Sequence, residues 1–305
     1  MDEQVTSSGG YPRGARATRW PVWLLLAGAI LQLGVQIAPD SYSVFGPYFL
    51  VTGDMVARWI DAVSPFLLAA VVVLAADRWP AGSRWLVIAA AALAVVGLLQ
   101  MASDAWWAIW ETSPDVIPEG TQSWLIGSFL GTGVAFVLAH ALLAGGLWAA
   151  RPDGHPGRTR VALMIMIALA GLIATGAGAW TVVPTLDYPG PREQLWVGVA
   201  GTLIIAAGFA SLAVVAIAAT RCAPRGDAMP EILIVIGVTV TMVASAWTWC
   251  APYIAPDVAG TPEGLFWVYS IPATAAVLGT LVMIAGFGLA ALAVRRRRAA
   301  GGAII

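Results

Sequence analysis

Residues 231–250 read EILIVIGVTVTMVASAWTWC, and residues 265–298 read LFWVYSIPATAAVLGTLVMIAGFGLAALAVRRRR. Each apolar part of this stretch is about 20 residues or longer, enough for a helix to cross a hydrocarbon core about 30 Å thick. Continuous apolar runs of this length exclude the short alternating strands of a membrane barrel. The stretch therefore predicts a membrane-spanning helical hairpin, with a polar corner at one end and four arginines at the other.

The same pattern recurs along the whole chain. Apolar residues make up 59% of it and charged residues only 11%, whereas soluble domains carry roughly 25% charged residues. Lipid must therefore cover most of the surface, and the predicted fold class is an all-α, polytopic integral membrane protein. The apolar segments predict eight membrane helices, at residues 20–38, 53–76, 85–104, 123–149, 160–183, 194–220, 231–250 and 265–294.

The charges are sorted between the two sides of the predicted bundle. Fourteen of the sixteen arginines fall on one side, and only Arg58 and Arg192 fall on the other. Because short arginine-rich loops stay in the cytoplasm, we expect both termini there, in a plasma membrane. Residues 1–18 are predicted to be a disordered cytoplasmic tail, and residues 299–305 a short cytoplasmic tail. The outer side holds eleven of the seventeen acids and ten of the fifteen tryptophans.

The chain also contains a short internal repeat. The segment SPDV at 113–116, followed by PEG at 118–120, parallels APDV at 255–258, followed by PEG at 262–264. Asp115 and Asp257 occupy equivalent places in the two segments. We interpret this repeat as two similar four-helix halves in parallel topology, residues 19–150 and residues 151–298. The match is short and rich in proline, so chance similarity remains an alternative.

A charged trio lies at the outer end of the second predicted helix. Asp54, Arg58 and Asp61 share one helix face, and Arg58 can pair with both acids. One interpretation is a polar ligand site that faces the bundle. The alternative is a pair of ion-paired turns at the level of the lipid headgroups, where charges cost little.

Polar amides recur at helical spacing on the first and third predicted helices. Gln32 and Gln36 lie four residues apart, as do Gln100 and Asp104. Amides in lipid usually hydrogen-bond to another helix. These four residues therefore predict either inter-helix bonds or a polar cleft that opens to the outer side.

Tryptophans are concentrated on the outer side, and Trp107 and Trp249 are candidates for ligand binding there. Aromatic faces beside carboxylates can bind a sugar, a cation or a lipid headgroup, although an interfacial aromatic belt is the simpler interpretation. Outer acids such as Asp115 and Asp257 could also form a catalytic pair. They lie among Pro and Gly residues typical of turns, so no catalytic residue is assigned.

Metal and cofactor sites are not predicted. His140 is the only histidine inside a predicted helix, and we interpret it as a hydrogen-bonded packing residue. Cys222 and Cys250 fall on opposite sides of the membrane, which excludes a disulfide between them. The predicted cytoplasmic loops are too short for a nucleotide-binding module, and none contains a glycine-rich phosphate loop.

Three functions remain open on the sequence. The first is a non-catalytic subunit or a module that binds a lipid or small ligand, with its working face on the outer loops rich in Trp and acids. The second is a secondary transporter of a small molecule, suggested by the two halves. The third is a membrane-embedded enzyme that acts on a lipid-linked or saccharide substrate. The expected partners are the lipid bilayer and a membrane protein or a second copy of the chain, and no nucleic acid.

Overall fold

The computed structural model describes residues 19–44, 53–112, 121–150, 156–186, 192–224, 227–254 and 266–301, together with Asp257 and Thr261. Within these residues the protein is a bundle of helices, eight of which are long and apolar enough to cross a membrane. This confirms the predicted all-helical fold and its eight helices of membrane-spanning length and composition. The eight are α2 (Arg19–Val44), α3 (Gly53–Ala75), α4 (Ser83–Thr112), α5 (Thr121–Ala149), α6 (Arg158–Trp180), α8 (Arg192–Cys222), α9 (Met229–Ile254) and α12 (Ile271–Gly301).

Several helices extend beyond the predicted apolar segments. Helix α4 continues to Thr112, eight residues past its predicted end at residue 104, and α12 continues to Gly301. Hydropathy falls at these ends, but Ala, Glu and Arg favour helix, so the helices continue into more polar surroundings. Short elements join the long ones: η1 (Ala76–Arg78), η2 (Pro80–Gly82), α7 (Val182–Leu186) and η4 (Phe266–Ser270).

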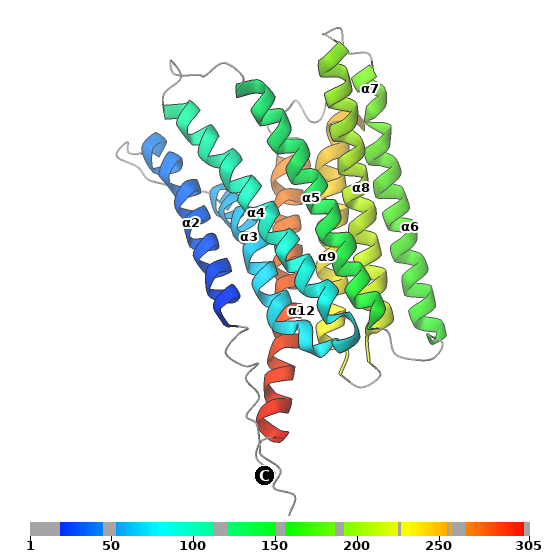
Figure 1. Cartoon of the computed structure of the whole chain (residues 1–305). Helices are drawn as coiled ribbons and strands as arrows, with labels where there is room; N and C mark the ends of the chain where they lie inside the picture. Colours follow the sequence, from blue (N-terminus) through cyan, green and yellow to red (C-terminus); the bar gives the residue numbers. More distant parts are fainter. Residues whose placement is uncertain are drawn as a thin grey trace, which may run out of the picture.

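Six of the long helices form a closed ring in the order α3, α4, α5, α8, α9, α12, with α12 packed against α3 again. The other two lie outside the ring (Figure 1): α2 packs against α3 and α4, and α6 packs against α8 and α9. Any space enclosed by the ring is therefore bounded by helices from both halves of the chain.

The two ends of the bundle differ in composition. One end, here called the basic end, contains the starts of α2, α6 and α9, the elements η1 and η2, and the end of α12 (Figure 1). The arginines described there are Arg78, Arg84, Arg158, Arg160, Arg221 and Arg295–Arg297. The opposite end, here called the aromatic end, contains Trp59, Trp106, Trp107, Trp124, Trp180, Trp196, Trp247, Trp249 and Trp267.

Helices α9 and α12 pack with their backbones in direct contact. A Cβ atom on Gly279 would lie only 2.7 Å from the Gly237 carbonyl oxygen, and one on Gly286 would lie 2.8 Å from the Pro230 carbonyl oxygen. Only glycine permits this approach, which is the usual role of small residues between membrane helices. The contact holds one wall of the ring at a short distance.

Candidate functional site

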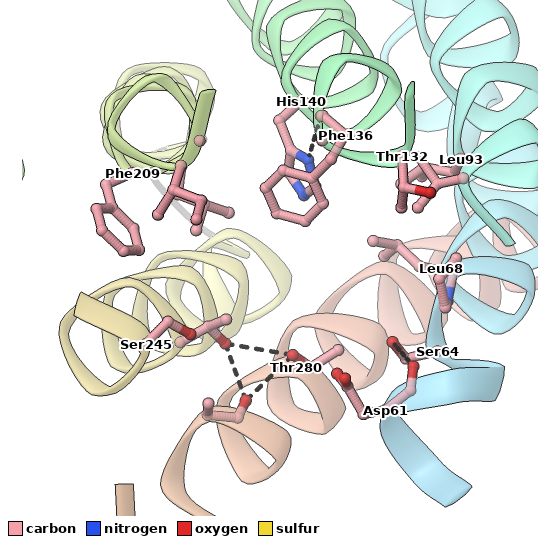
Figure 2. A pocket seen from close by; sticks show the side chains of 18 of the residues that line it. Asp61, Ser64, Leu68, Leu93, Thr132, Phe136, His140, Phe209, Ser245 and Thr280 are labelled. Carbon is pink, nitrogen blue, oxygen red and sulfur yellow. Dashed lines mark hydrogen bonds between the residues drawn. The ribbon is translucent and has the colours of Figure 1, made fainter. Parts of the chain in front are cut away.

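The ring encloses a cavity of about 350 Å³, here called the central cavity. All six ring helices contribute to its wall, which is largely apolar (Figure 2). Its volume lies at the lower end of the range for small-molecule sites, about 300–1,000 Å³. The polar side chains on the wall come from Asp61, Ser64, Thr132, His140, Thr241, Ser245 and Thr280.

A second hollow of about 480 Å³, here called the vestibule, lies towards the aromatic end. It is lined by residues of α3, α9, η4 and α12, including Arg58, Trp249 and Tyr269. The vestibule shares Asp61, Ser245 and Ala276 with the central cavity. The two hollows therefore adjoin, and the vestibule is the approach to the cavity from the aromatic end.

Asp61 lies where the two hollows meet. Its side chain is exposed by surface area, and it lines both hollows, so its carboxylate is accessible from within the bundle. Ser64, one turn further along α3, donates a hydrogen bond of 2.8 Å to the Asp61 backbone carbonyl and keeps its own hydroxyl satisfied. Of the predicted trio, Arg58 lines the vestibule, whereas the Asp54 side chain lies outside the described residues.

A polar cluster on α2 and α4 lies beside Asp61. The buried Gln32 donates a hydrogen bond of 2.7 Å from Nε2 to Asp104 Oδ2, and Gln36 also hydrogen-bonds the Asp104 side chain. The Asp104 carboxylate is near enough to repel that of Asp61. The structure thus brings Gln32, Gln36 and Asp104 together across two helices, while Gln100 lies half-buried one turn away on α4.

The part of the cavity wall formed by α9 and α12 carries hydroxyl groups. Thr280 donates a hydrogen bond of 3.1 Å to the Ala276 carbonyl, and Thr241 on α9 donates one of the same length to that oxygen from the neighbouring helix (Figure 2). The two hydroxyl oxygens are 3.4 Å apart. These bonds leave hydroxyl lone pairs that can accept a hydrogen bond from a ligand.

His140 lies on the α5 wall, 2% exposed. Its Nδ1 is 2.9 Å from the Phe136 carbonyl oxygen. Because a carbonyl only accepts, Nδ1 carries the hydrogen of this bond. His140 is therefore hydrogen-bonded within its helix, as the packing interpretation expects, and it also contributes to the cavity wall.

The two tryptophans proposed as ligand residues have different surroundings. Trp249 lines the vestibule, and its indole Nε1 donates a hydrogen bond of 3.0 Å to Thr181 Oγ1, which positions the ring. Trp107 lies at the end of α4 with 42% of its side chain exposed, and it lines neither hollow. Trp249 is thus beside the approach to the cavity, and Trp107 is not.

The central cavity is closed towards the basic end. Arg78, at the end of η1, donates hydrogen bonds of 2.8 and 3.1 Å to the two carboxylate oxygens of Glu231 at the start of α9. The side chains are 4% and 1% exposed. Beside them, Trp79 packs edge-on against Phe287 of α12, with ring centroids 5.9 Å apart. This contact joins the first half of the chain to the second.

Sequence patterns alone do not identify the Arg78–Glu231 pair, the Thr241–Thr280 pair or the phenylalanines of the cavity. Arg78 and Glu231 are 153 residues apart, and each looks like an ordinary charge at a helix end. Of the two outer acids considered as a catalytic pair, Asp115 lies outside the described residues, and Asp257 is exposed and lines neither hollow. No group of three His, Cys, Asp or Glu side chains suited to a metal occurs among the residues described.

No protein-family model, curated protein or solved structure matches this chain.

Proposed function

We propose that this protein is a secondary transporter of a small molecule, and that the central cavity is its substrate site. The observation that supports this is the position of the cavity. It lies inside a ring made of α3, α4 and α5 from the first half of the chain and α8, α9 and α12 from the second. Secondary transporters commonly bind their substrate at the interface between two structural repeats, near the middle of the membrane.

The packing of the helices supports two related halves. Helix α2 packs against α3 and α4, and α6 packs against α8 and α9 in the same way. Helix α4 packs against α5 as α9 packs against α12, and α12 contacts α3 as α5 contacts α8. This pairing matches the repeat in the sequence, because Asp115 follows α4 in the chain and Asp257 follows α9, the helix equivalent to α4 in the second half. We therefore take residues 19–150 and 151–298 as the two moving units.

Transport requires access to the cavity from each side in turn. In the arrangement seen here the vestibule leads to the aromatic end, and the Arg78–Glu231 pair and the packed side chains around it close the basic end. We place the basic end in the cytoplasm of a cell with this protein in its plasma membrane, because most of the arginines lie there. The state described is then open outward and closed inward.

Accessibility of the cavity from both sides tests transport without a known substrate. Thr132→Cys, in a chain whose native cysteines are replaced by Cys222→Ala and Cys250→Ala, puts one thiol on the cavity wall. A membrane-impermeant maleimide should modify it from either side, in right-side-out and in inside-out vesicles, because alternating access exposes the cavity to both. Val72→Cys is the matched control, since Val72 is fully buried and should react from neither side.

A blocking variant sharpens this test. Ser245 lines both hollows, so Ser245→Trp should fill the passage and reduce labelling from the aromatic end at least tenfold, whereas Ser245→Ala should leave it unchanged. Labelling of Thr132→Cys from the aromatic end alone, under every condition tried, would contradict transport.

A second candidate is a ligand-binding module or a subunit of a larger complex, and the vestibule is the observation that favours it. Arg58, Trp249 and Tyr269 form a polar and aromatic opening towards the outer side, which suits a headgroup or a small ligand without any movement of the helices. One-sided labelling of Thr132→Cys is the result this candidate predicts. Native mass spectrometry of the protein in nanodiscs would then show the retained ligand or protein partner. The enzyme hypothesis rests on outer acids, of which Asp115 lies outside the described residues and Asp257 is exposed and lines neither hollow.

A further inference from the structure

The charge of the central cavity has one sign. Among the described residues of its wall, Asp61 is the only carboxylate, and no arginine is among them. Arg58 lines the vestibule and not the central cavity. The Asp104 carboxylate, which is also negative, acts on that of Asp61 from outside the wall. The one carboxylate on the described part of the wall therefore gives it a site for a positive charge.

The rest of the wall is aromatic and aliphatic. Phe136 on α5 and Phe209 on α8 lie across the cavity from Asp61 (Figure 2). The wall also contains Phe129, Leu68, Leu93 and Met283. Aromatic faces attract cations through the negative face of the ring, most strongly where water is excluded. The wall can thus hold both the apolar body and the positive charge of a ligand.

The alternatives to a cation fit less well. An anion would be repelled by Asp61 and Asp104. A neutral apolar molecule that displaced water from the cavity would leave the Asp61 carboxylate without compensation, and an unpaired buried charge is costly. A cation with an apolar body satisfies the carboxylate and the apolar wall together.

We propose that the central cavity binds a hydrophobic organic cation and that Asp61 is its counter-ion. This inference rests on the proposed transport function, because it names the class of substrate that the cavity would carry. The Thr132, Ser245 and Thr280 hydroxyls would accept hydrogen bonds from an ammonium group if the cation bears one.

Equilibrium binding tests the inference on the full-length protein in nanodiscs. Three probes of nearly the same size and tetrahedral shape differ in charge: tetraphenylphosphonium is cationic, tetraphenylsilane is neutral and tetraphenylborate is anionic. After subtraction of binding to empty nanodiscs, tetraphenylphosphonium should bind saturably and at least tenfold more tightly than the other two. Equal affinities for all three probes would overturn the proposal.

Variants of the acids locate the counter-ion. Asp61→Asn should weaken binding of tetraphenylphosphonium at least tenfold, and Asp61→Glu, which keeps the charge, should retain most of it. The matched control is Asp257→Asn, because Asp257 is an exposed acid that lines neither hollow, and its affinity should not change. Unchanged binding in Asp61→Asn, with a normal gel-filtration profile, would show that Asp61 is not the counter-ion.

The two proposals fail in different ways. If tetraphenylphosphonium binds through Asp61 but Thr132→Cys is labelled from one side only, the cation site stands and transport is wrong. If Thr132→Cys is labelled from both sides but the cation shows no preference over the anion, transport stands and the substrate class is wrong.

Discussion

The basic end and the aromatic end of the bundle are built from the same helices, but they differ in how side chains fill the space between those helices. Towards the basic end, Leu86, Leu143, Ile234 and Phe287 are each fully buried in one continuous core. Towards the aromatic end, the ring encloses the central cavity and the vestibule. Atoms that line a cavity lack the van der Waals contacts that a filled core would give them. The aromatic end is therefore less stable than a fully packed end would be. Such a loss is typical of a part of a protein that binds something.

Charges are handled differently in the two regions as well. At the basic end a buried arginine meets a buried carboxylate with two hydrogen bonds, so both charges are compensated by protein. At the aromatic end Asp61 lines both hollows, and the Asp104 carboxylate acts on it with the same sign of charge. We therefore expect substitutions at the basic end to lower the stability of the protein more than substitutions at the aromatic end. Three substitutions test this order.

The largest effect is expected from Glu231→Ala. This change leaves Arg78, 4% exposed, without its main partner, and removing one member of a buried ion pair costs about 3–5 kcal/mol. The free energy of unfolding, measured by denaturation in mixed detergent micelles, should fall by that amount.

Asp227→Ala is the control for this prediction. Asp227 is 57% exposed and its carboxylate is 3.5 Å from Arg78, so its loss should cost only about 0–1 kcal/mol. The double variant Arg78→Met with Glu231→Leu should recover most of the stability, because replacing both charges with apolar groups is often neutral or favourable. Equal losses in Glu231→Ala and Asp227→Ala would show that the basic end is not locked by this pair.

An intermediate effect is expected from Gly279→Ala. Its new Cβ would lie 2.6–2.7 Å from atoms of Gly237 and Thr241 on α9, which forces two helices apart and costs about 1–3 kcal/mol as overpacking does. The same unfolding measurement applies. Gly288→Ala on the same helix meets no atom within 4 Å, so it should be neutral or slightly stabilising, as Gly to Ala changes in helices are. A loss in Gly288→Ala as large as that in Gly279→Ala would remove the packing explanation.

The smallest effect is expected from Trp249→Phe at the aromatic end. The substitution removes the hydrogen bond from Nε1 to Thr181 Oγ1, which contributes about 0.5–1.5 kcal/mol. Thr181 keeps its own bond of 2.7 Å to the Gly178 carbonyl, so no buried donor is left unpaired. Trp247→Phe, on the same helix with Trp247 52% exposed, should change stability by less. A loss above that of Glu231→Ala would reverse the order of the two regions.

Much of the architecture follows from the chain alone. The eight helices were predicted because a span of about 20 apolar residues has a single solution in lipid. The sequence shows which helix ends carry arginine. The structure then places most of those helix ends at the same end of the bundle. The predicted ends of α4 and α12 were wrong by several residues, because helix continues past the point where hydropathy falls.

The candidate site was only partly accessible to such reasoning. Helical spacing showed that Gln32 and Gln36 share a face, and that Arg58 and Asp61 do, because neighbours on a helix are set by local geometry. Which helix each face meets is a long-range matter. The hydrogen bond between Gln32 and Asp104 spans 72 residues, and nothing in either segment identifies the other as its partner.

Sequence by itself thus determined the all-helical class, the number of helices long and apolar enough to cross a membrane, and the positions of the charges between them, since each depends on the composition of one segment. Only the tertiary structure decided that six helices close into a ring, that Arg78 and Glu231 meet at one end, and that Asp61 faces a cavity at the other. Those facts depend on how side chains from distant segments fill a shared space. Such contacts exist only once the helices have packed together, so no single segment contains them.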